Sequence, residues 1–369
     1  MTARVAIFRK RLLSYSETFI ADQGRFLPSY RPLFCGYRKD TSGFQLLHGS
    51  NTLLLDDFSG TPSLSKLMLR LRLGGARAWI DAIAERSPAL LHAHFFNDGL
   101  DAVKLGKRLG IPVVTTVHGH DITKYENAVA QSKTNRRFFA EVDKIIAVSD
   151  FIAGQALARG CPEDKLIQHY IGIDLEKFAQ QKNETAEPSL LFVGRLVEKK
   201  GCTYLLQAME QLKTRFPGLS LTIIGEGELK SALQREAGER QLRVDFAGSA
   251  DAAAIRQRLA QCWVFVAPSI TAQSGDAEGL GMVFLEAQAL QTPVVSFRSG
   301  GVVEAVAEGS SALLSDEKDV AGLAANIAEL LDNSTLRHNM GASGRKRVEQ
   351  YFDIRRQCAR LESIYAELD

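Results

Sequence analysis

The arrangement of apolar residues constrains the fold of this chain more than any other feature. Short runs rich in Val, Ile and Leu alternate with longer amphipathic stretches along most of the 369 residues. Buried parallel strands have this continuous apolar character, and the amphipathic stretches between them fit crossover helices. The pattern therefore predicts an α/β fold in which helices cover both faces of parallel sheets.

The apolar runs form two series, which predicts two sheets. In the first series the predicted strands are Val5–Phe8, Leu33–Tyr37, Thr52–Leu55, Leu90–His94, Val113–His118, Lys144–Val148 and Leu166–Tyr170. In the second they are Leu190–Val193, Ser220–Ile224, Val244–Phe246, Val264–Ala267 and Pro293–Phe297. Residues 180–188, between the series, are polar and aperiodic and end in a proline, as expected of a linker and hinge.

The length agrees with two domains, since a domain takes about 100–200 residues. We expect Rossmann-like, doubly wound domains over residues 1–180 and 189–345, and a C-terminal helix over 346–369 that could pack back toward the first domain. Gly341 and Gly344 are the expected breaks in the helical pattern of the tail. Because α/β sheets bind ligands at the carboxyl ends of their strands, we expect a ligand in the cleft between the domains.

The charge is unevenly distributed, although the chain as a whole carries only +2. Residues 1–180 hold 24 Lys and Arg against 18 Asp and Glu (+6), and the remainder holds 21 against 25 (−4). A basic first half favours contact with an anionic membrane surface or a phosphorylated lipid. The basic residues are dispersed and no aromatic-plus-basic motif accompanies them, so we do not expect a nucleic-acid partner.

The start of the chain predicts a cytoplasmic protein. Residues 1–13 are interrupted by four basic residues and lack the apolar core of a signal peptide, and no run of about 20 apolar residues follows. With the basic first half, this suggests a cytoplasmic location with peripheral contact on the inner face of the membrane. The five cysteines are scattered and contain no Cys-x-x-Cys pair, so we expect reduced thiols rather than a zinc site.

The most informative stretch runs from Ser274 through Glu278-Gly-Leu-Gly281 into a predicted helix, Met282–Leu290. Glycines allow the backbone to approach a ligand closely, and the start of a helix offers unpaired N–H groups and a partial positive charge to a phosphate. Glu286 lies in the otherwise apolar helix, where a carboxylate is costly unless it is hydrogen-bonded. Sugar hydroxyls could supply those bonds.

A basic loop follows the predicted strand Leu190–Val193. Gly194 and Arg195 come first, and Lys200 follows five residues after the arginine. A guanidinium can bind two phosphate oxygens at once, and an ammonium adds a mobile positive charge. Together these two side chains could neutralise a departing diphosphate.

These motifs, together with Thr292-Pro-Val-Val, resemble glycosyltransferase family 4. The resemblance implies the GT-B fold of two Rossmann-like domains and transfer of a sugar from a nucleotide donor with retention of anomeric configuration. Arg195 and Lys200 would hold the donor diphosphate, Glu278 the transferred sugar, and Glu286 the nucleotide ribose. The donor-binding residues implied by position are Gly194, Arg195, Lys200, Gly279, Leu280, Gly281, Met282, Val283 and Glu286.

The first half resembles the family at two places. His118, in Val-His-Gly-His-Asp after a predicted strand, is similar to the histidine that contacts the donor sugar near the site of transfer. With Arg195, Lys200 and Glu278 it completes the catalytic set that the resemblance implies. The loop containing Ser16 and Glu17, and the segment containing His94, are similar to members that build bacterial exopolysaccharides. We expect these three residues to bind the acceptor.

The resemblance implies a hexosyltransferase that uses a UDP-sugar or GDP-sugar, the former preferred, and a saccharide acceptor of cell-surface polysaccharide biosynthesis that is lipid-linked. The acceptor proton would leave on a donor phosphate oxygen. No Asp-x-Asp sequence occurs in the chain, so we expect neither a metal nor another cofactor.

Three other functions are considered. A metal-dependent hydrolase could use His92-x-His94 and His118-x-His120, but alternate strand residues are expected to point to opposite faces and no further ligand motif appears. An NAD-dependent oxidoreductase needs a third glycine where Gly225-Glu-Gly227 is followed by Glu-Leu-Lys. A non-catalytic nucleotide-sugar-binding protein could share the fold, but it would have no need of the full set of charged residues.

Overall fold

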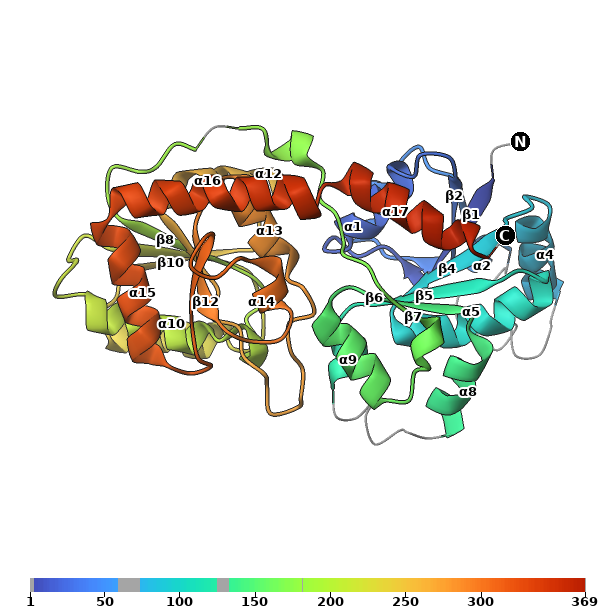
Figure 1. The fold of residues 1–369 in the computed structure, drawn as a ribbon, viewed down its shortest axis with the longest axis horizontal. Helices are drawn as coiled ribbons and strands as arrows, with labels where there is room; N and C mark the ends of the chain where they lie inside the picture. The colour runs from blue at the N-terminus through green and yellow to red at the C-terminus, as the bar shows by residue number, and fades with distance from the viewer. Residues whose placement is uncertain (1–2, 59–73, 125–132, 181, 369) are drawn as a thin grey trace. The chain divides into compact units, whose positions relative to one another are not determined.

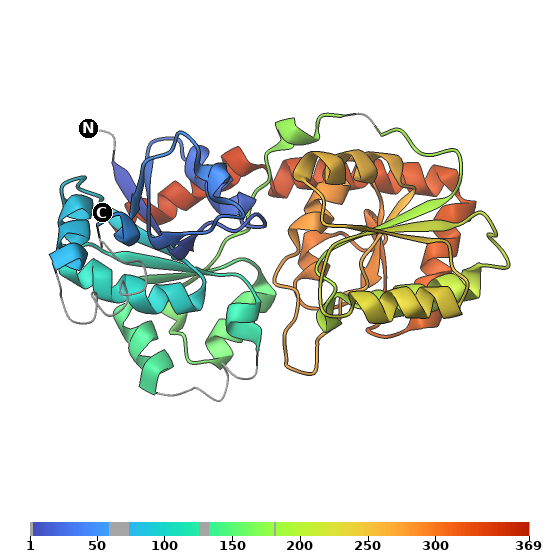
Figure 2. The ribbon, with the colours of Figure 1, turned by 180° about the vertical axis from the view of Figure 1, so that it is seen from behind.

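The computed structural model describes residues 3–58, 74–124, 133–180 and 182–368. These residues form two compact units, each built on its own parallel sheet (Figures 1 and 2). The first unit comprises residues 1–122, 126–172 and 354–369, and the second comprises 123–125 and 173–353.

The sheet of the first unit has the strand order β3-β2-β1-β4-β5-β6-β7. Its strands are β1 (Arg4–Leu12), β2 (Arg31–Lys39), β3 (Thr52–Leu54), β4 (Leu90–His94), β5 (Val113–Val117), β6 (Lys144–Ala147) and β7 (Leu166–Gln168). Its helices are α1 (Thr18–Arg25), α2 (Leu55–Phe58), α4 (Gly74–Ala84), α5 (Phe96–Leu109), α6 (His120–Thr123), α8 (Lys133–Glu141), α9 (Asp150–Ala158) and α17 (Ile354–Ala366). All seven strands predicted for this half are confirmed, with ends that differ by a few residues.

The sheet of the second unit has the order β10-β9-β8-β11-β12-β13. Its strands are β8 (Ser189–Val193), β9 (Ser220–Ile224), β10 (Val244–Gly248), β11 (Val264–Val266), β12 (Val294–Phe297) and β13 (Ala312–Ser315). Its helices are α10 (Cys202–Leu212), α11 (Lys230–Glu239), α12 (Ala252–Gln261), α13 (Met282–Ala289), α14 (Val302–Ala305), α15 (Val320–Asp332) and α16 (Ser334–Tyr351). The edge strand β13 was not predicted, because its sequence, Ala-Leu-Leu-Ser, contains none of the β-branched or aromatic residues that favour strands.

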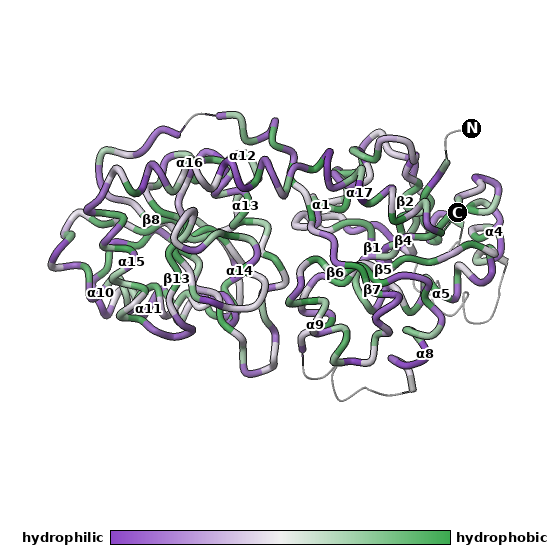
Figure 3. The backbone as a smooth tube through the Cα atoms, in the orientation of Figure 1, coloured by the Kyte–Doolittle hydropathy of each residue, from purple (hydrophilic) through white to green (hydrophobic). Residues whose placement is uncertain are grey.

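The central strands of both sheets are buried on two faces, as their apolar sequences require. In the second unit α10 and α15 pack together on one side, and α13 packs against α16 on the other. The strands are largely green in the hydropathy colouring of Figure 3, whereas the helices alternate between green and purple. Among the residues that the structure describes, no helix is both long and apolar enough to cross a membrane.

The boundary between the units differs from the expected linker at 180–188. The chain passes into the second unit at Ile173, whose N–H donates to the Phe352 carbonyl at 2.8 Å. The polar stretch is then held on the second unit, because Lys182 Nζ donates to Thr292 Oγ1 (2.8 Å) and Asn183 N–H donates to Ala260 O (3.0 Å). The polar residues in this stretch therefore form hydrogen bonds with the second unit and do not make up a free linker.

The C-terminal segment also differs from the prediction. Helix α16 continues through Gly341 and Gly344 without a break, and the chain leaves it only after Tyr351, not at residue 346. These glycines serve close packing on the α13 side: a Cβ atom at Gly341 would lie 2.0 Å from Gln291 O. Helix α17 then packs on the first unit, where Leu361 and other apolar residues join the buried core.

Candidate active site

The strongest candidate site begins at the carboxyl edge of the second sheet, where β8 ends. Gly194 and the exposed Arg195 follow the strand directly, and a single 3₁₀ turn over Glu198–Lys200 brings Lys200 back over Gly194. A Cβ atom at Gly194 would lie 3.5 Å from Lys200 Cε. Gly201 ends the turn with φ of +64°, a conformation that glycine adopts without strain. The loop thus carries both predicted phosphate ligands.

Two glycines in the loop after β9 pack directly against the backbone of the loop after β8. A Cβ atom at Gly225 would lie 1.9 Å from Gly194 O, and one at Gly227 would lie 2.3 Å from Leu196 O. This is the pair that was considered as a dinucleotide-binding motif. Here the two glycines allow two backbone segments to touch, which explains them without a dinucleotide.

The central contact of the site is an ion pair between Lys200 and Glu278. Lys200 Nζ lies 2.5 Å from Glu278 Oε2, and each side chain is only 12% exposed. Burial raises the pKa of Glu278, but the charges of Lys200, Lys199 and Arg195 outweigh it and lower the pKa to about 2. The carboxylate is therefore ionised at neutral pH, where it can accept hydrogen bonds from sugar hydroxyls.

Helix α13 begins beside this pair. Its N-cap is Gly281, with φ of +82°, and the loop before it is supported by Gly301 after β12. Gly301 N–H donates to Glu278 O at 2.8 Å, and a Cβ atom at Gly301 would lie 1.9 Å from Gly279 O. The first N–H groups of a helix have no intrahelical acceptor, so this end of α13 suits a phosphate. Sequence reasoning missed the supporting Gly301.

Glu286 lies in the second turn of α13 and is half-buried. Burial raises the pKa of its carboxyl from 4.5 to about 7, and the charge of Arg256 offsets only part of this effect. A carboxyl group that is only partly ionised at neutral pH gains from donors that favour its charged form. The vicinal hydroxyls of a ribose are donors of this kind.

A buried ion pair behind the site was not predicted. Lys199 Nζ donates to Asp276 Oδ1 at 2.9 Å and to Ala277 O at 3.2 Å. The two side chains are 7% and 12% exposed. This pair joins the loop after β8 to the segment before Glu278, and so it fixes the backbone on which Lys200 and Glu278 meet.

In the first unit, His118 follows β5 at the carboxyl edge of the sheet. Asp121 shapes its turn, accepting hydrogen bonds from the backbone N–H groups of His118 (3.1 Å) and Gly119 (2.8 Å). The His118 Nε2 atom lies 3.1 Å from His94 Nδ1, and the two rings stack with their centroids 5.3 Å apart. Burial, with the positive charge of Arg9, holds the pKa of His118 well below 6.5, so the ring is neutral.

His92 and His94 on β4 lie close together, and the expectation that they point to opposite faces is wrong. Residues two apart on a strand share a face, and these rings stack with their centroids 4.5 Å apart. His92 Nδ1 lies 2.6 Å from the Tyr365 hydroxyl and its Nε2 lies 2.7 Å from Thr116 Oγ1. Both nitrogens of His92 are thus occupied, which leaves none for a metal ion.

His94 and Glu17, two of the predicted acceptor ligands, are buried. His94 is 1% exposed and bonds to His118. The Glu17 carboxylate accepts a hydrogen bond from Arg9 Nη2 (2.5 Å) and one from the Ser14 backbone N–H (3.0 Å). Ser16, the third, is exposed. Only Ser16 is therefore presented to solvent, while the other two support their neighbours.

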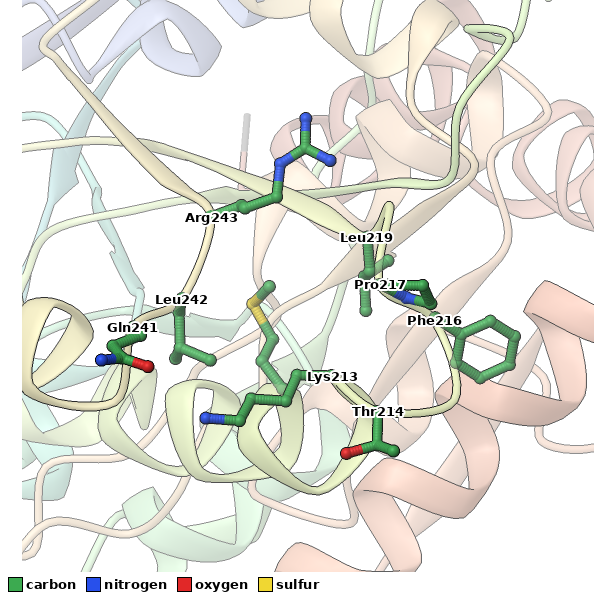
Figure 4. A pocket seen from close by; sticks show the side chains of 9 residues that line it. Lys213, Thr214, Phe216, Pro217, Leu219, Gln241, Leu242 and Arg243 are labelled. Atoms are coloured by element: carbon green, nitrogen blue, oxygen red, sulfur yellow. The ribbon is translucent and has the colours of Figure 1, made fainter.

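No group of three or more His, Cys, Asp or Glu within the described ranges is arranged to hold a metal ion. A hollow of about 430 Å³ in the second unit lies between the end of α10 and the residues that precede β9 and β10, and Figure 4 shows its lining, including Lys213, Leu219 and Arg243. It therefore lies at the amino ends of these strands, away from Arg195, Lys200 and Glu278.

Comparison with known proteins identifies the family. Residues 42–177 match the family described as Glycosyltransferase Family 4, and residues 174–347 match Glycosyl transferases group 1. The chain is 32% identical over 281 residues to a putative colanic acid biosynthesis glycosyltransferase of Salmonella typhimurium, covering 73% of this chain and 69% of that protein. The chain is a glycosyltransferase of this family. The resemblance found in the motifs is confirmed.

Other relatives of the glycosyltransferase are similar along nearly their whole length. A GDP-mannose-dependent phosphatidylinositol monomannoside mannosyltransferase of Mycolicibacterium smegmatis is 29% identical over 379 residues, covering 96% of this chain and 94% of the relative. The crystal structure of Anabaena Alr3699/HepE in complex with UDP superposes with a TM-score of 0.78 at 18% identity, with both chains covered completely. The predicted GT-B fold is confirmed.

Proposed function

We propose that this glycosyltransferase moves a hexose from a nucleoside diphosphate donor to a saccharide hydroxyl, with retention of configuration, during cell-surface polysaccharide biosynthesis. The Lys200–Glu278 ion pair beside the start of α13 carries the proposal. It puts a positive group that can bind the anionic diphosphate next to a carboxylate that can accept hydrogen bonds from the neutral sugar's hydroxyls, which complements a sugar nucleotide.

The positive groups supply leaving-group stabilisation. Arg195 and Lys200 come from the loop after β8, and the N-terminus of α13 adds its own partial charge. Preorganised groups of this kind are worth most in a site that excludes water, where removal of one typically costs about 10²–10³ in rate. Because Arg195, Lys200 and the start of α13 all offer positive charge to the diphosphate, we propose that the reaction uses neither a metal nor another cofactor.

The proton balance of the transfer needs no protein carboxylate as base. The bond between the anomeric carbon and the diphosphate oxygen breaks, the acceptor oxygen bonds to that carbon on the same face, and the acceptor proton passes to a phosphate oxygen. Glu278 has a pKa of about 2 and is a poor base at neutral pH. Its role is to bind sugar hydroxyls, and His118 keeps the contact to the donor sugar that the family resemblance implies.

The relatives support the substrate class. The relative from Salmonella is named for colanic acid biosynthesis and that from Mycolicibacterium for the use of GDP-mannose on a lipid, whereas the solved Anabaena protein holds UDP. We infer a UDP-hexose donor for this chain, with GDP-mannose as the second candidate. The basic first half favours a lipid-linked acceptor at an anionic membrane surface.

Calorimetry with UDP and GDP tests the proposal directly. The wild type should bind one of the two nucleotides, and Lys200→Ala should weaken binding at least about tenfold, because an ion pair to phosphate is lost. Lys213→Ala, at the opposite end of the strands, is the matched control and should bind as the wild type does. If the wild type binds neither nucleotide, the proposal is overturned. If it binds one of them, donor hydrolysis measured over a panel of nucleotide sugars identifies the sugar.

A further inference from the structure

We propose that Tyr15 is an aromatic platform on which a pyranose ring of the acceptor saccharide stacks. This inference rests on the glycosyl transfer proposed above. Within the described parts of the chain, four large apolar side chains are clearly exposed, and Tyr15 is the most exposed of them at 58%. It lies in the loop between β1 and α1, at the carboxyl edge of the first sheet, where α/β sheets bind their ligands.

The backbone that carries Tyr15 is held rigidly although the ring is free. The buried Glu17 carboxylate accepts the Ser14 N–H at 3.0 Å, and Arg9 Nη2 bonds to the same carboxylate at 2.5 Å. The Tyr15 N–H donates to Ser42 Oγ at 3.3 Å. A Cβ atom at Gly43 would lie 2.4 Å from Tyr15 N, so the loop rests directly on another segment of backbone.

A rigid loop with an exposed ring suits binding more than stability. Burial of the whole ring would stabilise the fold, and here more than half of the side chain stays in contact with solvent. A preorganised side chain loses little conformational entropy when a ligand binds, which increases affinity. Glu17, one of the expected acceptor ligands, holds this loop in place.

The chemistry around the ring fits a sugar. The C–H bonds on one face of a pyranose carry partial positive charge and pack favourably on the electron-rich face of an aromatic ring. The hydroxyls of Ser14 and Ser16 flank Tyr15 and lie 3.2 Å apart, so they can exchange hydrogen bonds with the hydroxyls at the sugar's rim.

The platform lies on the same sheet edge as the proposed reaction centre. Strands β1, β4 and β5 are adjacent in the sheet, so the loop after β1 and His118 after β5 share one edge. Phe19, in the first turn of α1, connects them: its ring centroid lies 5.0 Å from that of His118. A saccharide stacked on Tyr15 would thus be held on the edge that carries His118.

A membrane contact fits the surroundings of Tyr15 less well. Membrane-surface elements present several apolar side chains together with Lys or Arg. The residues beside Tyr15 are the small polar Ser14, Ser16 and Ser42. The other exposed large apolar residues, Leu157, Val303 and Tyr351, lie on α9, α14 and α16.

The test compares Tyr15→Ala and Tyr15→Phe with Tyr351→Ala as the matched control, since Tyr351 is an exposed tyrosine (43%) of the second unit. Saturation-transfer NMR measures binding of methyl glycosides of glucose, galactose, mannose and fucose at tens of millimolar. We expect at least one glycoside to bind the wild type and to bind Tyr15→Ala about tenfold more weakly, as loss of an aromatic stack predicts. Tyr15→Phe keeps the ring and Tyr351→Ala removes an exposed ring from the other unit, so both should stay within about twofold of the wild type.

Three results would overturn the inference: no glycoside binds the wild type, Tyr15→Ala binds as well as the wild type, or Tyr15→Ala loses only its co-sedimentation with phosphatidylglycerol vesicles. The last result would assign the ring to a lipid surface. Calorimetry with UDP and GDP on the same variants separates this inference from the proposed function. Tyr15→Ala should bind the nucleotide as the wild type does. If the wild type itself bound neither UDP nor GDP, that result would count against the transferase proposal.

Discussion

Replacement of Glu286 by glutamine should increase the stability of the second unit at pH 8 and weaken its binding of the nucleotide. Burial raises the pKa of this carboxyl from 4.5 to about 7. The folded state therefore holds the proton more tightly than the unfolded state, and the free energy of unfolding falls as pH rises from about 4.5 to about 7. Above that range the whole penalty for an ionised, half-buried carboxylate is present.

The size of the penalty follows from the difference between the two pKa values. At ~1.4 kcal/mol for each pKa unit, a rise from 4.5 to about 7 corresponds to at most about 3.5 kcal/mol. Glutamine has the shape of the protonated carboxyl and cannot ionise. Glu286→Gln should therefore lie within about 1 kcal/mol of the wild type at pH 5 and exceed its stability at pH 8 by up to about 3.5 kcal/mol. Each kcal/mol moves Tm by about 2–4 °C.

Thermal unfolding at pH 5 and pH 8, with and without UDP, measures both effects. The variant should melt higher than the wild type at pH 8 without nucleotide, yet gain less from UDP, because a neutral amide makes weaker hydrogen bonds to the ribose than a carboxylate does. Glu239→Gln, an exposed residue of α11, is the control and should show neither effect. Equal melting of Glu286→Gln and the wild type at pH 8 would refute the reasoning about burial.

Four further outcomes are expected. Arg195→Ala should lower turnover by at least about 10²-fold while circular dichroism stays native, and near-normal turnover would remove it from the site. Lys199→Met should destabilise the second unit by about 3–5 kcal/mol in chemical denaturation, because Asp276 would be left as an unpaired buried charge. Gly341→Ala should lower Tm, since its Cβ would lie 2.0 Å from a backbone oxygen, whereas Gly238→Ala in α11 meets nothing within 4 Å and should be neutral or stabilising. EDTA should leave turnover unchanged, and restoration of lost activity by a divalent metal would contradict the proposed chemistry.

The strands could be predicted because burial on both faces leaves a direct record in the sequence. All five residues of β4 and all five of β5 are buried, and most of them are apolar. The start of α13 could be predicted for a related reason, since Gly281 with positive φ interrupts the pattern where the helix begins. Features that depend on the local backbone conformation can therefore be predicted from the sequence.

Features that depend on a contact with a residue far away in the sequence could not be predicted. Gly341 was expected to break a helix, because its reason for being glycine is the Gln291 oxygen, 50 residues earlier in the chain. Lys199 and Lys200 are neighbours in sequence, yet one forms a buried pair with Asp276 and the other faces the site with Glu278. Only the path of the backbone through the 3₁₀ turn distinguishes them.

Glu17 and Glu278 show that the role of a glutamate is equally hard to predict from the sequence. Glu17 is buried, Glu278 is half-buried, each lies beside a basic side chain, and both were predicted to bind a substrate. The Glu17 carboxylate accepts hydrogen bonds from Arg9 and from the Ser14 N–H, so it holds the backbone next to Tyr15. Glu278 is paired through Oε2 with Lys200, which is itself a proposed phosphate ligand beside the start of α13. The sequence shows a glutamate that could meet a substrate in both places, and only the path of the backbone shows that Glu17 is held by Arg9 and a backbone N–H whereas Glu278 is paired with a residue of the proposed donor site.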